Sequence, residues 1–164
     1  EEYQIYSNVW SVTSYNELAR DGIAVEEYNR LHPLAEQAQE SWVSQQLRST
    51  DGIVVSATDH MRAYSEQIRA HLPDNRPYVT LGTDGYGRSD TRGNLRSFFG
   101  VDAAHIVVAT LKKLADEGEV DARLVKDAIS SFELDTDRPA AWLPQTHPEV
   151  HAVADYKEPS GEEN

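Results

Sequence analysis

Short runs of β-branched and aromatic residues constrain the fold of this chain more than any other feature. The run IVV at 53–55 is continuously apolar, as expected for a strand buried on both faces. YVTLG at 78–82 is a second run, and NVWSVTS at 8–14 alternates and predicts a further strand. Segments with helical spacing separate these runs. The alternation predicts an α/β domain with a largely parallel sheet.

Capping residues mark the helices of the first third. Ser14 and Glu17 form a capping box, so a helix is expected to begin at Tyr15. Gly22 is expected to end this helix, because glycine is the usual C-terminal cap. A second helical piece follows over 24–31.

Two further helices are expected before the second apolar run. The segment 34–48 has apolar residues near helical spacing. Thr58 or Asp59 is expected to cap the next helix.

The clearest helices come late in the chain. Asp102 and Asp121 predict two N-caps, and each is flanked by apolar residues at hydrophobic-staple spacing. Gly118 stands where a glycine commonly ends the first of these helices.

These elements leave the predicted sheet small. Three strands are few for a sheet that carries helices on two faces. The first residue is Glu1 and not methionine. We therefore expect either a missed strand or an upstream strand and helix in a longer or processed chain.

Composition excludes several function classes. The chain has no cysteine, which excludes disulfides and thiolate metal sites. Its net charge of −13 argues against binding to nucleic acid. No window approaches ~18 consecutive apolar residues, and there is no signal-peptide pattern, so we expect no membrane partner. The segment 139–164 is polar, acidic and expected to be a flexible tail.

The segment 82–93 offers a candidate site. It joins a strand to a helix and combines glycines with charges. Its candidate residues are Asp84, Gly85, Tyr86, Gly87, Arg88, Ser89, Asp90 and Arg92. Phosphate binding, contact with a partner surface, and a rigid turn with Asp–Arg pairs are all open. The glycine spacing matches neither known phosphate-binding motif, which favours the rigid turn.

No other residues form a catalytic or metal-binding pattern. His147 and His151 are four positions apart, but Pro148 lies between them and disfavours a helix that would bring them together. No serine lies in a nucleophile motif. No catalytic, cofactor-binding or metal-binding residue is therefore assigned.

Several longer blocks carry a family resemblance. VWSVTSYNELARDG at 9–22, LGTDGYGRSDTRGNLRSFFGVDAAHIV at 81–107 and LADEGEVD at 114–121 resemble the carboxyl-terminal part of homodimeric bacterial pyruvate dehydrogenase. The resemblance runs colinearly from about 5 to 138.

The resemblance implies a transketolase-type C-terminal domain over 1–138. Such a domain is a three-layer α/β/α sandwich on a mixed, mostly parallel sheet, and this one would lack its first strand and helix. The full-length enzyme decarboxylates pyruvate on thiamine diphosphate with Mg²⁺ and transfers the acetyl unit to lipoyl groups. Both cofactors would lie on upstream domains, with none on this segment, which would be inactive alone.

The resemblance also implies partners. They are the upstream domains, a second subunit of a homodimer and the lipoyl acyltransferase subunit, in the cytoplasm. The loop would lie at an interdomain or subunit surface, or else at the mouth of the active site. The alternatives are a free-standing docking or regulatory domain and a flavodoxin-like ligand binder.

Overall fold

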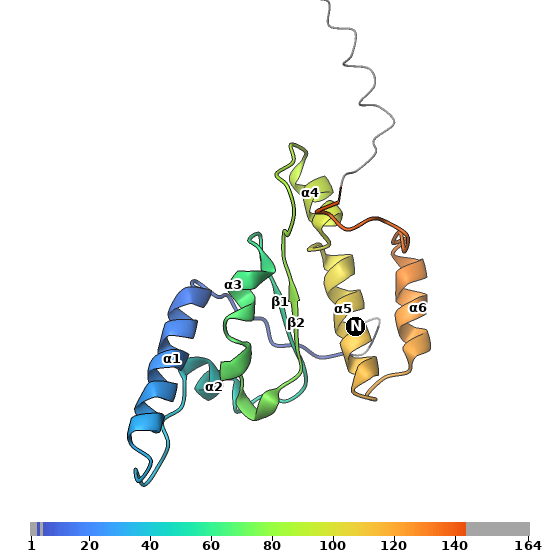
Figure 1. The fold of residues 1–164 in the computed structure, drawn as a ribbon. Coiled ribbons are helices and arrows are strands. Elements are labelled where there is room, and N and C mark those ends of the chain that lie inside the picture. The colour runs from blue at the N-terminus through green and yellow to red at the C-terminus, as the bar shows by residue number, and fades with distance from the viewer. Residues whose placement is uncertain (1–2, 4, 144–164) are drawn as a thin grey trace, which may run out of the picture.

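The computed structural model describes residue 3 and residues 5–143. Figure 1 shows helices on both sides of a central pair of strands. Their bounds are α1 (Tyr15–Leu31), α2 (Trp42–Leu47), β1 (Val54–Ala57), α3 (Arg62–Glu66), the 3₁₀ turns η1 (Arg69–His71) and η2 (Pro73–Asn75), β2 (Tyr78–Leu81), α4 (Arg92–Phe99), α5 (Ala103–Asp116) and α6 (Ala122–Ser131).

The two strands of the described chain are parallel, and helices lie on both of their faces. Val54 pairs with Tyr78 and Ala57 with Leu81, so the carboxyl ends of β1 and β2 lie together. Helix α3 packs on one side, with α1 and α2 beyond it, while α5 packs on the other with α6 outside it. The predicted α/β class, with parallel strands between helical layers, is confirmed.

The apolar core is divided by the strands. One cluster joins α1, α2 and the η turns to β2, and a second joins α5 and α6. The buried members of the first are Val43, Leu47, Ile68, Leu72 and Tyr78, and those of the second are Leu111, Val125 and Ala128. Tyr3 and Ile5 pack on the second cluster and Tyr15 on the first. The intervening residues therefore cross from one side of the sheet to the other.

The predicted strand at 8–14 is wrong. This segment has no regular secondary structure in the described chain, although its alternation is typical of a strand. Val9 is 94% exposed and Trp10 is 52% exposed. A segment with alternating apolar residues forms a stable strand only when a neighbouring strand supplies hydrogen bonds. Among the described elements β1 and β2 pair only with each other, so the segment 8–14 has no such neighbour.

The expected break at Gly22 is also wrong. Helix α1 begins after Ser14 as predicted, and the Ser14 side chain accepts a hydrogen bond from the Glu17 N–H. The helix then continues through Gly22, which is buried. A Cβ atom at Gly22 would lie 2.3 Å from Cγ of His71. This glycine therefore makes room for the His71 ring and does not end the helix.

The helix predicted over 34–48 is shorter in the structure. Only Trp42–Leu47 is helical, and Ser41 caps it by accepting a hydrogen bond from the Ser44 N–H. The preceding segment is held differently, because the Asn29 side chain bonds both the N–H and the carbonyl of Gln39.

The helix expected after Thr58 or Asp59 begins only at Arg62. The Thr58 N–H instead extends the strand pairing by donating to the Leu81 carbonyl. The His60 carbonyl accepts from the Thr83 N–H. These links to the end of β2 hold the segment out of the helix.

The late helices are confirmed. Asp102 caps α5 by accepting from the His105 N–H at 2.9 Å, and Asp121 caps α6 by accepting from the Arg123 N–H at 2.8 Å. Gly118 adopts φ +80° directly after the end of α5. Such local signals need no tertiary partner to act.

No helix in the described part of the chain is long and apolar enough to cross a membrane. Most of the tail predicted over 139–164 lies outside the described residues, together with His147 and His151.

We predict that Gly22→Ala destabilises the domain by about 1–3 kcal/mol, the usual cost of overpacking. The His71 side chain is only 6% exposed, so its ring has little room to move away from a new methyl group. Gly93→Ala in α4 is the matched control, because nothing lies within 4 Å of its added Cβ atom. That variant should gain up to about 1 kcal/mol. Urea unfolding measures both, and equal stability of the two variants would contradict the prediction.

Candidate functional site

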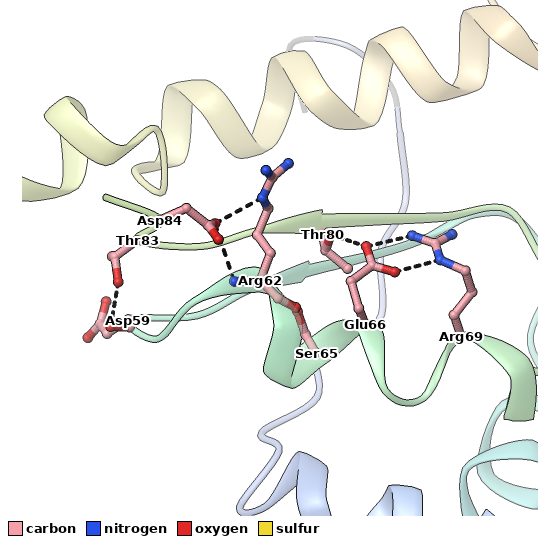
Figure 2. Close-up of polar contacts among 8 residues, drawn as sticks. All are labelled: Asp59, Arg62, Ser65, Glu66, Arg69, Thr80, Thr83 and Asp84. Atoms are coloured by element: carbon pink, nitrogen blue, oxygen red, sulfur yellow. Dashed lines mark hydrogen bonds and ion pairs between the residues drawn. The ribbon is translucent and has the colours of Figure 1, made fainter. Parts of the chain in front are cut away.

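The glycine loop is fixed at its base to the segment that follows β1. The Thr83 N–H donates to the His60 carbonyl at 2.9 Å, and the Thr83 hydroxyl donates to the Asp59 carbonyl at 2.8 Å. Asp84 accepts from the Arg62 side-chain Nε at 2.9 Å and from its backbone N–H at 3.3 Å. Figure 2 shows these contacts where the two strands end. The loop therefore starts from a rigid base.

Two loop glycines are required by close backbone approach. A Cβ atom on Gly82 would lie 2.6 Å from the His60 carbonyl oxygen. Gly85 adopts φ +141°, and its Cβ atom would lie 2.8 Å from the Ala141 carbonyl oxygen. Gly87 has nothing within 4 Å of such an atom. Close packing of the backbone therefore explains the glycines at 82 and 85 without a phosphate-binding role.

The Asp–Arg contacts of the loop are only partly internal to it, because Arg88 attracts Asp90 electrostatically. Asp84 pairs with Arg62 of α3, which lies outside the loop. The Arg88 guanidinium lies over the Phe98 ring, 4.5 Å from its centroid. A rigid turn is supported, but its rigidity comes from contacts with α3 and α4.

Asp90 organises the start of α4. Its carboxylate accepts from the Thr91 N–H and from the Asn94 side chain, each at 2.7 Å. The Asn94 hydrogen bond is the stronger cause, and together the two bonds lower the pKa of Asp90 from its usual value. Thr91 is the N-cap of the helix. Ser89 and Arg92 are exposed beside these residues.

A second polar network supports β2 from the α3 side, as Figure 2 shows. Glu66 receives two hydrogen bonds from the Arg69 guanidinium, at 2.6 and 2.7 Å, and one from the Thr80 hydroxyl at 2.5 Å. The Arg69 hydrogen bond is the main cause of a lowered pKa for Glu66 and a raised pKa for Arg69. Arg69 also donates to the Tyr78 carbonyl at 3.0 Å.

Tyr78 lies at the centre of this network. Its ring packs in the first core cluster, and the Arg69 guanidinium lies 4.9 Å from the ring centroid. Burial raises the pKa of Tyr78 to about 12. Its hydroxyl donates to the Ser65 carbonyl at 2.9 Å, so it acts as a structural donor.

A hollow of about 360 Å³ lies between the end of β1, α4 and the start of α5. Its polar lining comes from Thr58, Asp59, Arg96 and Asp102. Arg96 and Asp59 approach to 3.9 Å. Such a charged, open hollow can recognise polar groups.

The N-terminus of α5, at the edge of this hollow, is already occupied by its own cap. Burial opposes ionisation of Asp102, but the backbone N–H and ring of His105 outweigh it and lower the pKa of Asp102. The ring Nδ1 of His105 lies 2.6 Å from the carboxylate. An incoming anion would meet this carboxylate, so the helix end does not offer a phosphate site.

Sequence reasoning found the loop but missed the residues that hold it. Asp59, Arg62 and Phe98 were not identified as members of the site. The predicted parallel pairing of the two apolar runs could have revealed them, because the carboxyl ends of paired parallel strands lie at one edge of a sheet. The segments after 57 and after 81 therefore had to meet. Among the described residues, no group of three or more His, Asp or Glu side chains could hold a metal ion.

The chain resembles known proteins along most of its length. The family model for the transketolase-like TK C-terminal domain matches residues 1–102. The pyruvate dehydrogenase E1 component of Pseudomonas aeruginosa is 45% identical over 137 residues, which cover 84% of this chain and 15% of that protein.

Two other relatives agree. The pyruvate dehydrogenase E1 component of Cupriavidus necator is 47% identical over 139 residues, covering 85% of this chain and 15% of that protein. The corresponding Escherichia coli K12 protein is 46% identical over 138 residues, covering 84% and 15%. The chain thus spans about 15% of the length of these relatives.

We predict that Glu66→Gln lowers the free energy of unfolding at neutral pH by on the order of 1 kcal/mol, because it weakens a partly exposed charge-assisted pair. The folded-state pKa of Glu66 lies below its ordinary value of 4.5. Its contribution is therefore complete above the unfolded-state pKa and is lost as the pH falls through the lowered folded-state pKa. Urea unfolding at a series of pH values measures this.

The difference in stability between wild type and Glu66→Gln should shrink as the pH falls below 4.5. Glu27→Gln, on an exposed residue of α1, serves as the control and should stay within about 0.5 kcal/mol of wild type. A difference for Glu66→Gln that stays constant down to the acid transition would contradict the assigned role.

Proposed function

The chain belongs to the family of transketolase-like C-terminal domains, and on this premise we propose that it is the carboxyl-terminal part of a pyruvate dehydrogenase E1 component. The observation that carries the proposal is the similarity to several such components, at 45–47% identity over 84–85% of the chain. We propose that the whole enzyme decarboxylates pyruvate and passes the acetyl unit to lipoyl groups.

In this proposal the described segment performs recognition and packing. Thiamine diphosphate would supply the carbanion chemistry of the whole enzyme, with Mg²⁺. Among the described residues there is no cluster of three metal-ligating side chains, and the N-terminus of α5 is capped by Asp102. We therefore assign both cofactors to upstream parts of the longer chain and derive no step through them.

The partners we propose are the upstream domains, the second subunit of a homodimer and the lipoyl acyltransferase subunit, in the cytoplasm. The exposed apolar side chains at 8–14 support contact with further parts of the enzyme, because large exposed apolar groups mark interaction surfaces. Residues 1–138 would form the packed domain and 139–164 the tail.

The first test measures the mass of the native protein that contains this segment. An antibody against 86–99 is used on cell extract under denaturing conditions. We expect a band several times larger than 18.4 kDa that co-purifies with lipoyl-bearing subunits. The purified 164-residue chain should not decarboxylate pyruvate when thiamine diphosphate and Mg²⁺ are added.

A native band near 18.4 kDa would reject this proposal and favour a free-standing docking or regulatory domain. Decarboxylation by the 164-residue chain alone would reject the assignment of the chemistry to upstream domains.

We also propose that the 84–92 loop packs against another domain or subunit, with the mouth of the active site as the second possibility. Its support is the rigid base and the 81% exposure of Tyr86. Arg88→Ala combined with Arg92→Ala in the longer enzyme should weaken dimer or complex assembly, measured by analytical ultracentrifugation. Intact assembly with lost turnover would reject the interface and favour the active-site mouth.

A further inference from the structure

Helix α4 and the loop before it form a positive region in an acidic chain. The chain has 28 acidic and 15 basic residues excluding histidine, for a net charge of −13. Within 85–100, by contrast, Arg88, Arg92 and Arg96 face a single acidic residue, Asp90. We call the exposed side of α4 that carries Arg92 and Arg96 the α4 surface.

Arg92 and Arg96 lie one helical turn apart and so project from the same side of α4. Arg92 is exposed and has no hydrogen bond or ion pair with any residue that the structure describes. The Arg96 side chain is 46% exposed, and its described ion pair, with the 72% exposed Asp59, has a long separation of 3.9 Å. Two like charges at this spacing repel each other, so the pair does not stabilise the helix as an ion pair would.

The nearby carboxylates are held by other groups. Asp84 pairs with Arg62, and Asp90 accepts hydrogen bonds from Thr91 and Asn94. The acidic groups closest to the arginines along the chain are therefore directed to structural bonds. Arg92 and Arg96 retain their capacity to bind carboxylates of another molecule.

The helix that carries the α4 surface, and the loop before it, are held in place. Gly100 ends the helix in the left-handed conformation, and the Arg88 guanidinium lies over the Phe98 ring. Tyr86 is largely exposed, and no residue of α4 is fully buried. Arginine and tyrosine on an ordered surface are the residue types enriched where proteins bind each other tightly.

We propose that the α4 surface binds an acidic segment of a partner protein. This inference rests on the interface role proposed above for the loop. It adds that the partner's surface in that interface is acidic. Charge complementarity selects the occupant, since arginine forks bind carboxylates in two-point contacts. The net charge of the chain disfavours nucleic acid as the source of the negative charge.

The test uses the 164-residue chain and a fluorescent decapeptide of alternating glutamate and aspartate, at low ionic strength where screening is weak. Fluorescence anisotropy measures its dissociation constant. Arg92→Gln combined with Arg96→Gln should weaken binding roughly tenfold, because each surface ion pair contributes about threefold. A decapeptide of alternating glutamine and asparagine should not bind.

Arg20→Gln combined with Arg30→Gln is the matched control. It removes the same charge from exposed positions of α1 and should change the dissociation constant by less than about twofold. Circular dichroism verifies that both double variants are folded. Equal weakening in the two would overturn the proposal, because the attraction would then be diffuse. Absence of binding to the wild type would overturn it as well.

Two further outcomes would assign the α4 surface to a different occupant. If a chain ending at Leu143 binds the peptide tenfold more tightly than the 164-residue chain, its own acidic tail is the occupant. If the peptide dissociates a dimer of the wild type that the Arg92/Arg96 variant does not form, the occupant is a second copy. Either result overturns the partner inference but leaves the native-mass test of the proposed function unaffected.

Discussion

The parallel register of β1 and β2 is the constraint on which the rest of the described structure depends. Because Ala57 lies opposite Leu81, the segments that leave the two strands emerge side by side. They are then joined by backbone and side-chain bonds that include the Asp84–Arg62 ion pair. A shift of register would separate these segments, and the glycine loop would lose its rigid base.

Sequence predicted best what is decided locally. The caps at Ser14, Asp102 and Asp121 were found because a capping side chain bonds a backbone N–H within three residues of itself. The two paired strands were found from their β-branched runs, but β1 is only partly buried and not buried on both faces as expected. Gly22 was misjudged because its role is set by His71, far away in the chain. No local pattern carries that information.

The candidate loop was only half predictable for the same reason. Its glycines and charges identified it, but the residues outside the loop that hold it were not found. Arg62 binds Asp84 across 22 positions, and Phe98 of α4 lies beneath Arg88. The prediction of a strand at 8–14 was wrong for a different reason. Its local pattern is strong, but the described structure offers it no hydrogen-bonding neighbour. Secondary structure that requires a partner cannot be inferred from alternation alone.

The contact between Arg69 and the Tyr78 carbonyl has a consequence for how the sheet can grow. The Val54 N–H bonds the Pro77 carbonyl, so in the alternating pattern of a parallel ladder the Tyr78 carbonyl points away from β1. The Arg69 guanidinium donates a hydrogen bond to this carbonyl and is itself held by the Glu66 carboxylate. A strand approaching this edge would have to displace a charge-assisted bond, which protects the edge against non-native pairing as edge charges do in other proteins.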